Sequence, residues 1–205
     1  MRNLLIAILA ALLSVSAFAD IFQDRVDEAL AKGDPAAVVK ELENDSYRGN
    51  IKAAYQLGLF YREGKLVPRN DAVAMEWLEQ AASTDWIRYR FKLGMAEAQY
   101  ELGVMRRDGL GKPVGAQAAA EWFELAANQG HTLAQISLAE MYLKGQGVSA
   151  DPAQAYFWSS IAAYTLTGSD LERPQATSKA AKNLLTAEQV KELDKSVETW
   201  YPRSI

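Results

Sequence analysis

Residues 53–82 read AAYQLGLFYREGKLVPRNDAVAMEWLEQAA, and two variants of this segment follow along the chain. They are AQYELGVMRRDGLGKPVGAQAAAEWFELAA at residues 98–127 and AQISLAEMYLKGQGVSADPAQAYFWSSIAA at residues 134–163. The three segments share a glycine and a tryptophan, at Gly64, Gly109 and Gly145 and at Trp77, Trp122 and Trp158. Each segment also contains a pair of adjacent alanines at its end. Self-similarity of this kind is the signature of a repeat array.

Each segment predicts two helices joined by a turn. In the first segment Ala53, Leu57 and Phe60 recur at helical spacing, and Gly64 stands where a left-handed residue often ends a helix. Asn70 or Asp71 is then expected to cap a second helix. The apolar side of that helix consists of Ala74, Trp77, Leu78 and Ala81. The predicted fold class is an all-α, right-handed α/α solenoid of antiparallel helix pairs, with one tryptophan per repeat packed between neighbouring hairpins.

The spacing of the repeats is uneven. Leu102 and Leu138 place the second and third repeats 36 residues apart, whereas Leu57 and Leu102 place the first and second 45 apart. The nine extra residues lie between Ala82 and Gly94. Apolar and basic residues alternate in this insertion, which predicts either an extended segment or a lengthened helix. Insertions in repeat proteins tend to lie on one face, which is often the binding face.

The N-terminal segment has the three parts of a secretory signal peptide. Arg2 supplies a positive charge, residues 4–13 form an apolar run, and residues 17–19 read Ala-Phe-Ala. The apolar run is shorter than the roughly 20 residues that span a bilayer. We therefore expect cleavage after Ala19, export to a bacterial periplasm, and a mature form without a membrane anchor.

The remaining chain divides into three parts. Residues 20–48 are expected to form degenerate capping helices, with Asp34 as an N-cap before Pro35. Residues 49–164 contain the three repeats with their insertion. Residues 165–205 are expected to form a loop, up to residue 174, and then capping helices. The last of these helices begins with a capping box at Thr186 and Gln189, and it is expected to cover the open end of the third repeat.

Composition excludes several classes of function. The chain has 205 residues, a formal net charge of −4 and no cysteine. Removal of the signal peptide, which carries only the positive charge of Arg2, changes the net charge from −4 to −5. A mildly acidic chain is a poor candidate for nonspecific nucleic-acid binding, which needs a basic surface. Disulfides and thiol chemistry are excluded by the absence of cysteine.

The repeats resemble the Sel1-like family of α/α solenoids, which is related to tetratricopeptide repeats. The third repeat carries the clearest match, at Leu138, Met141, Tyr142, Gly145, Gly147, Val148, Asp151, Ala155 and Trp158. The second repeat departs from the family pattern at Arg106 and Lys112, where the family has Tyr and Val. The resemblance implies a scaffold or adaptor that binds other proteins, and exported members are associated with envelope processes. Some cysteine-rich relatives have been described as β-lactamases, a role that does not transfer to a chain without cysteine.

No enzyme signature is present. His131 is the single histidine and follows Gly130, so we expect it to be a solvated loop residue rather than a catalytic base. One histidine without cysteine does not build the usual transition-metal shell, and the acidic clusters lack the spacing of a calcium loop. The sequence therefore predicts no catalytic residue, no metal site and no cofactor.

Two sets of residues are candidates for binding a partner. The first lies opposite the core stripe of each first helix and consists of Tyr55, Leu59 and Arg62 with their equivalents Tyr100, Val104 and Arg107. Tyrosine and arginine are enriched at protein interfaces, and the first helices of stacked hairpins usually line the concave surface. The second set lies in the insertion and consists of Trp86, Arg88, Tyr89 and Arg90. For both sets the alternative is packing against neighbouring parts of the chain.

These observations favour an exported, non-catalytic scaffold or adaptor that binds a protein partner through its concave face. The alternative is an envelope polysaccharide-binding module that uses exposed aromatic and arginine side chains. A third hypothesis, a hydrolase acting on cell-wall or β-lactam substrates, lacks a nucleophile–base pair. The partner, the pathway and the oligomeric state stay open.

Overall fold

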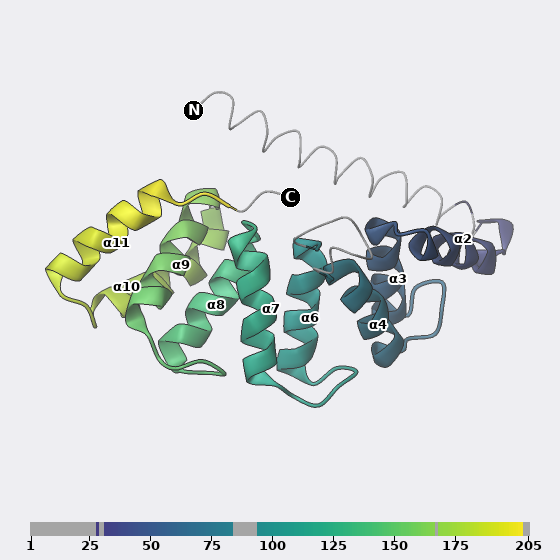
Figure 1. Ribbon diagram of the computed structural model, residues 1–205, viewed down its shortest axis with the longest axis horizontal. Coiled ribbons are helices and arrows are strands. Elements are labelled where there is room, and N and C mark those ends of the chain that lie inside the picture. Colours follow the sequence, from purple (N-terminus) through teal and green to yellow (C-terminus); the bar gives the residue numbers. More distant parts are fainter. Residues whose placement is uncertain (1–27, 29–30, 84–93, 167, 203–205) are drawn as a thin grey trace, which may run out of the picture.

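The computed structural model describes residues 28, 31–83, 94–166 and 168–202, and within these ranges the chain is a row of antiparallel helix pairs (Figure 1). The repeats are the pairs α3 (Ile51–Glu63) and α4 (Asp71–Ala82), α6 (Ala96–Asp108) and α7 (Ala116–Asn128), and α8 (Thr132–Lys144) and α9 (Pro152–Thr165). The flanking elements are α2 (Pro35–Tyr47), a short 3-10 helix (Gly168–Leu171), α10 (Glu172–Lys182) and α11 (Ala187–Thr199). The prediction of an all-α solenoid is confirmed.

Polar side chains cap α2, α3, α4, α8, α9 and α11, and left-handed glycines end the first helix of each repeat. The Asn70 side chain accepts a hydrogen bond from the backbone N–H of Val73, at 3.2 Å, which settles the choice of cap for α4. Gly64 adopts φ 71° after α3, and its N–H donates to the carbonyl of Phe60. The caps formed by Asp34 and Thr186 also lie where the sequence predicts them.

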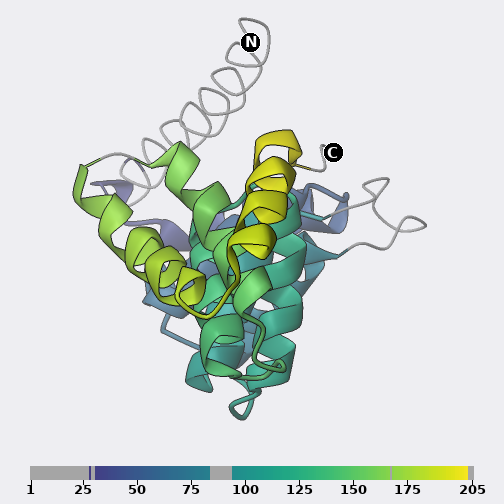
Figure 2. The same cartoon turned by 90° about the vertical axis from the view of Figure 1, so that its left-hand side faces the viewer.

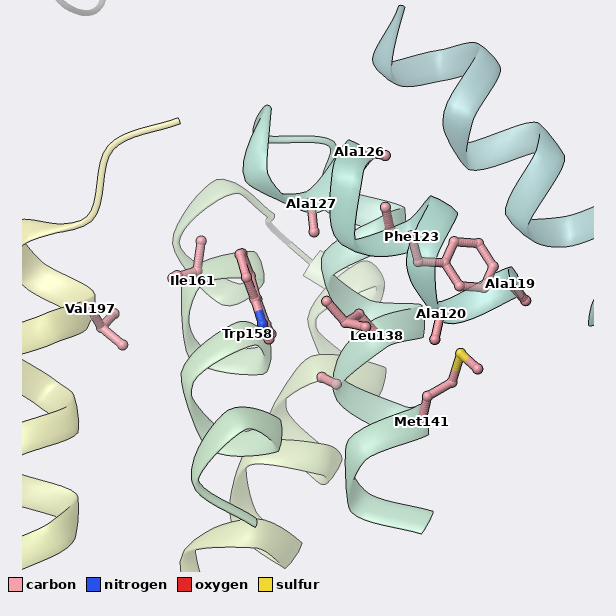
Figure 3. Close-up of a cluster of buried hydrophobic side chains, with 12 residues drawn as sticks. Ala119, Ala120, Phe123, Ala126, Ala127, Leu138, Met141, Trp158, Ile161 and Val197 are labelled. Carbon is pink, nitrogen blue, oxygen red and sulfur yellow. The ribbon is translucent and has the colours of Figure 1, made fainter. Parts of the chain in front are cut away.

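Small residues allow the helices to pack at very short range. A Cβ added at Gly58 would lie 2.6 Å from Leu78, and one added at Gly103 would lie 2.5 Å from Phe123. The closing alanines of each repeat include Ala81, which is fully buried. Figure 3 shows the core around the third repeat, where the labelled side chains include Phe123, Leu138, Met141 and Trp158. The paired helices are therefore close-packed where these small residues lie.

The tryptophans have the packing role that the sequence predicts. Trp158 is 5% exposed and belongs to the core of the third repeat. Trp77 is partly buried and lies against the clusters on both sides of the first repeat, and Trp122 lies against the core that joins α4 to α6. Trp77 and Trp122 therefore lie between adjacent hairpins, whereas the ring of Trp158 packs on the C-terminal segment, 6.1 Å from the ring of Trp200.

The nine-residue insertion leaves the repeat geometry intact. The N–H of Met95 donates to the carbonyl of Ala81 at 3.0 Å, and the N–H of His131 donates to the carbonyl of Ala126 at the same distance. These are equivalent positions, because the two alanines hold the same place in successive repeats. The turn between repeats therefore closes with the same hydrogen bond whether the insertion is present or not.

Helices outside the three repeats cover both ends of the array. At one end, Val38, Val39 and Leu42 of α2 pack on Leu57 and Phe60 of α3. At the other end, α10 and α11 both contact α9, as Figures 1 and 2 show. Buried Val190 and Val197 are the residues of α11 that face the core. Apolar surface of the terminal repeats is thus removed from water at each end.

The prediction of a loop from residue 165 to residue 174 was wrong, because most of this segment is helical. The segment contains the 3-10 helix, and α10 begins at Glu172 rather than near residue 178. Pro174 is the third residue of α10, where a backbone N–H has no partner within the helix. The proline is therefore tolerated inside the first turn of α10, although residue 174 was expected to lie in a loop.

Several predictions concern residues outside the described ranges. These are the signal peptide at residues 1–19 and most of the insertion, including Trp86, Arg88, Tyr89 and Arg90. Within the described ranges, each helix is too short or too polar to cross a membrane.

Candidate functional site

The first-helix face of the solenoid contains the six described candidates for partner binding. In α3, Tyr55, Leu59 and Arg62 are all partly buried. The Tyr55 ring packs against the core shared by α3, α4 and α6. Burial, together with the negative charge of Glu97, raises the pKa of the Tyr55 hydroxyl to about 12. Tyr55 is therefore in large part a packing residue between the first and second repeats.

Arg62 connects the first helices of two successive repeats. Its guanidinium forms an ion pair and hydrogen bond with Glu101 of α6, and it lies 3.5 Å from Glu63. The side chains of Arg62 and Glu101 are 25% and 15% exposed, so their interaction is less screened by water than one at the open surface. This pair bridges α3 and α6 through side chains.

The second repeat uses the equivalent positions in the same way. Tyr100 and Val104 of α6 pack against the core of the third repeat. The Tyr100 ring stacks on His131, with centroids 4.6 Å apart and an interplanar angle of 21°, and it lies 5.8 Å from the Phe123 ring. Tyr55, Tyr100 and Val104 therefore pack against neighbouring parts of the chain, which was the alternative to partner binding.

Arg107 is the most accessible of the candidates. It donates two hydrogen bonds to the carboxylate of Asp108, at 2.7 and 3.0 Å, and its side chain remains 46% exposed. These bonds hold the pKa of Asp108 below its usual value. Arg107 also interacts electrostatically with Glu140 of α8, which in turn accepts two hydrogen bonds from Arg173 of α10.

Alternating charges therefore run along this face from α3 to α10. Most of the charge is compensated within the chain, and the aromatic rings are half-buried. Of the six candidates, Arg107 is exposed and the other five are partly buried. That this face binds a partner stays a prediction.

His131 differs from its expected environment. It is the N-cap of α8, and its Nδ1 accepts a hydrogen bond from the N–H of Ala134 at 3.3 Å. Burial under the Tyr100 ring and the surrounding helices lowers the pKa of its imidazole to about 4. The expectation of a solvated loop histidine was wrong, because the stacking of α6 on the α7–α8 turn is not visible in the local sequence. The neutral ring has a structural role as a cap.

Metal binding finds no support in the described part of the chain. Within it, no group of three or more histidine, aspartate or glutamate side chains is close enough to hold an ion.

The sequence did not predict a groove of ≈ 380 Å³ that lies between α9 and α10. Tyr156, Ser160 and Tyr164 line it from α9, and Ser178, Lys179 and Lys182 line it from α10. The groove escaped prediction because one wall belongs to a helix outside the repeats, part of which was expected to be a loop. The helical spacing of the polar residues of α10 was the available signal.

The fold has counterparts among known proteins. The family model described as Sel1 repeat matches residues 51–83, 96–131 and 132–164. A solved structure of a Sel1 repeat protein from Oxalobacter formigenes is similar, with 23% sequence identity and a TM-score of 0.60. The similarity covers 82% of this chain and 65% of that protein, so this chain spans slightly less than two thirds of its length. At this identity the likeness concerns the fold alone.

A second similar structure is c5321, a protective antigen present in uropathogenic Escherichia coli strains that displays an SLR fold. Its sequence identity is 24% and its TM-score is 0.46, and the similarity covers 78% of this chain and 39% of that protein. The comparison with curated proteins finds no match.

Proposed function

The chain belongs to the Sel1-repeat family, and from this premise we propose that it is an exported, non-catalytic scaffold that binds a protein partner along its first-helix face. Repeats of this family generally mediate interactions between proteins. A scaffold of this kind supplies an extended surface on which a partner contacts several repeats at once.

The observation that carries the proposal is the repetition of chemistry at equivalent positions. Tyr55 and Arg62 in α3 correspond to Tyr100 and Arg107 in α6, and all four lie on the first helices. Inter-repeat packing and the Arg62–Glu101 pair hold this surface in one arrangement, so little ordering is needed when a partner binds. The exposed guanidinium of Arg107 is suited to an acidic group of the partner.

Export is supported by the order of features in residues 1–19, namely a positive charge, an apolar run and an Ala-Phe-Ala site. The periplasm is the proposed compartment. Mass spectrometry of the chain recovered from the periplasmic fraction is expected to find Asp20 at the N-terminus. Recovery of the intact N-terminus from the cytosol would contradict this part of the proposal.

Site-specific photo-crosslinking tests the binding face. A photoreactive residue is placed at Leu59 or Arg107 on the first helices, or at Glu76 or Glu121, which are exposed on the second helices. We expect the same partner to be crosslinked from the first pair of positions and not from the second pair. Equal crosslinking from all four positions, or from the second helices alone, would contradict the assignment of the face.

A further inference from the structure

One wall of the α9–α10 groove lies beyond the repeats, because the matched repeats end at residue 164 and α10 begins at Glu172. The groove volume of ≈ 380 Å³ is in the range of sites that bind small ligands or short peptide segments. Its surface is therefore not a general feature of the repeats. It depends on α10, which lies outside the matched repeats.

The wall formed by α10 presents one helical face to the groove. Gln175, Ser178, Lys179 and Lys182 are spaced so that all four share one side of the helix. The seven residue steps from Gln175 to Lys182 span about 10 Å along a helix. An extended peptide covers that length with about three residues.

The groove carries positive charge from two lysine side chains. Lys179 and Lys182 are exposed, and among the residues that the structure describes neither ammonium group has an ion-pair or hydrogen-bond partner. The carboxylate of Asp194 is close, but it accepts a hydrogen bond from the Tyr156 hydroxyl at 2.7 Å. Two free ammonium groups beside each other favour an anionic ligand.

The remaining lining favours a peptide over a sugar. The Tyr156 hydroxyl is bound to Asp194, and the hydroxyls of Ser160 and Ser178 are 3.3 Å apart and bound to each other. Few hydroxyl groups are thus free to bind the many hydroxyls of a saccharide. Ala163 and the ring of Tyr164, whose residue is 73% exposed, instead supply apolar surface.

We infer that the α9–α10 groove binds a short, extended peptide segment of a partner protein in which carboxylates and apolar side chains alternate. The carboxylates pair with Lys179 and Lys182, and an apolar side chain lies on the ring of Tyr164. This inference rests on the proposed scaffold function and names the chemistry of the partner. It adds a second contact region at the C-terminal end of the array.

Fluorescence anisotropy with the purified full chain tests the inference. The probe is a fluorescein-labelled hexapeptide of alternating glutamate and leucine, and its control has glutamine in place of glutamate. We expect the glutamate peptide to bind about fivefold more tightly, the size expected for two exposed ion pairs, and to lose this advantage as NaCl is raised. Equal affinity for the two peptides would overturn the inference.

Two double variants locate the site. Lys179→Glu with Lys182→Glu is expected to abolish the preference for the glutamate peptide. Lys40→Glu with Arg48→Glu produces the same change of net charge at the opposite end of the array, where both side chains are exposed, and is expected to retain the preference. Circular dichroism confirms that each variant is folded. Equal losses in the two variants would mean a nonspecific charge effect and would overturn the inference.

Two further arms separate this inference from its alternatives. Tyr164→Ala is expected to weaken the glutamate peptide severalfold, whereas Tyr201→Ala, at another exposed tyrosine, is expected to have no effect. Tighter binding of a glucuronate oligomer than of the peptide would overturn the choice of a peptide. If the peptide fails to bind while partner crosslinking from Arg107 persists, the groove is overturned and the scaffold function stands.

Discussion

The first and third repeats have the same turn between their helices but different residues in it. Leu66 has φ 66° in the first repeat, and Gly147 has φ 72° at the equivalent position of the third. A Cβ at Gly147 would lie 2.3 Å from the carbonyl of Ala116, at the start of the second helix of the preceding repeat. Leu66 has no such neighbour, and its side chain instead packs against the cluster that includes α2.

This difference shows that the turn has two separate structural requirements. The left-handed conformation is required in both repeats, whereas the absence of a side chain is required only where another repeat precedes. The second repeat supports this reading, because a Cβ at Gly111 would lie 2.5 Å from the carbonyl of Asp71. The first repeat adjoins α2 instead of another repeat, which leaves room for a leucine that contributes to the core. Terminal repeats are atypical for reasons of this kind.

The largest expected effect is that of Gly147→Ala. The substitution combines left-handed strain with a backbone clash, and it is expected to lower the free energy of unfolding by about 3 kcal/mol. Urea denaturation measures the loss. The matched control is Gly168→Ala, because Gly168 has φ 64° with open space around it and is expected to lose only about 1 kcal/mol. Equal losses of stability in the two variants would contradict the conclusion that crowding between repeats requires a glycine at residue 147.

The helix caps of the two repeats are expected to respond differently to pH. Asn50 caps α3 and does not titrate, whereas His131 caps α8 with a pKa lowered from 6.5 to about 4. Because the folded state disfavours the protonated ring, the stability is fully present above pH 6.5 and falls between pH 6.5 and 4. From pH 7 to pH 5 the loss is about 2 kcal/mol.

His131→Asn is the matched variant for this prediction, because asparagine keeps the cap without titrating in this range. Urea denaturation of both proteins at pH 7 and pH 5 measures the difference. An identical pH dependence in the two proteins would show that His131 is not the source of the acid sensitivity.

Ion pairs on the first-helix face are expected to differ between the repeats as well. Glu101→Gln leaves the sheltered Arg62 without its partner and is expected to cost about 1 kcal/mol. Glu140→Gln removes the partner of Arg173, whose side chain is 58% exposed, and is expected to cost less than about 0.5 kcal/mol. Thermal unfolding measures both. The reverse order would contradict the difference in screening between the two pairs.

The smallest expected effect is that of Leu66→Gly. Relief of the left-handed conformation gains about 1 kcal/mol, and the loss of a partly buried leucine costs a similar amount. The net change in the free energy of unfolding is expected to stay within about 0.5 kcal/mol. A loss comparable to that of Gly147→Ala would mean that the two turns are constrained in the same way.

Much of the fold could be read from short segments of sequence. The glycines that end α3, α6 and α8, the cap at Asn70 and the capping box at Thr186 all depend on atoms within one turn of helix. The repeat landmarks predict the helix pairs for the same reason. Local interactions of this range are present in the sequence itself, so pattern and spacing were sufficient.

The environment of the candidate sites depended on contacts between distant segments. The stacking of Tyr100 on His131 joins α6 to the start of α8, and the Arg62–Glu101 pair joins two repeats. The groove needs α10 to pack against α9. Periodicity places a side chain on a face of its own helix, but burial and pairing depend on which helix lies opposite. That information arises only when the hairpins stack, because water is excluded by the neighbouring element rather than by the segment itself.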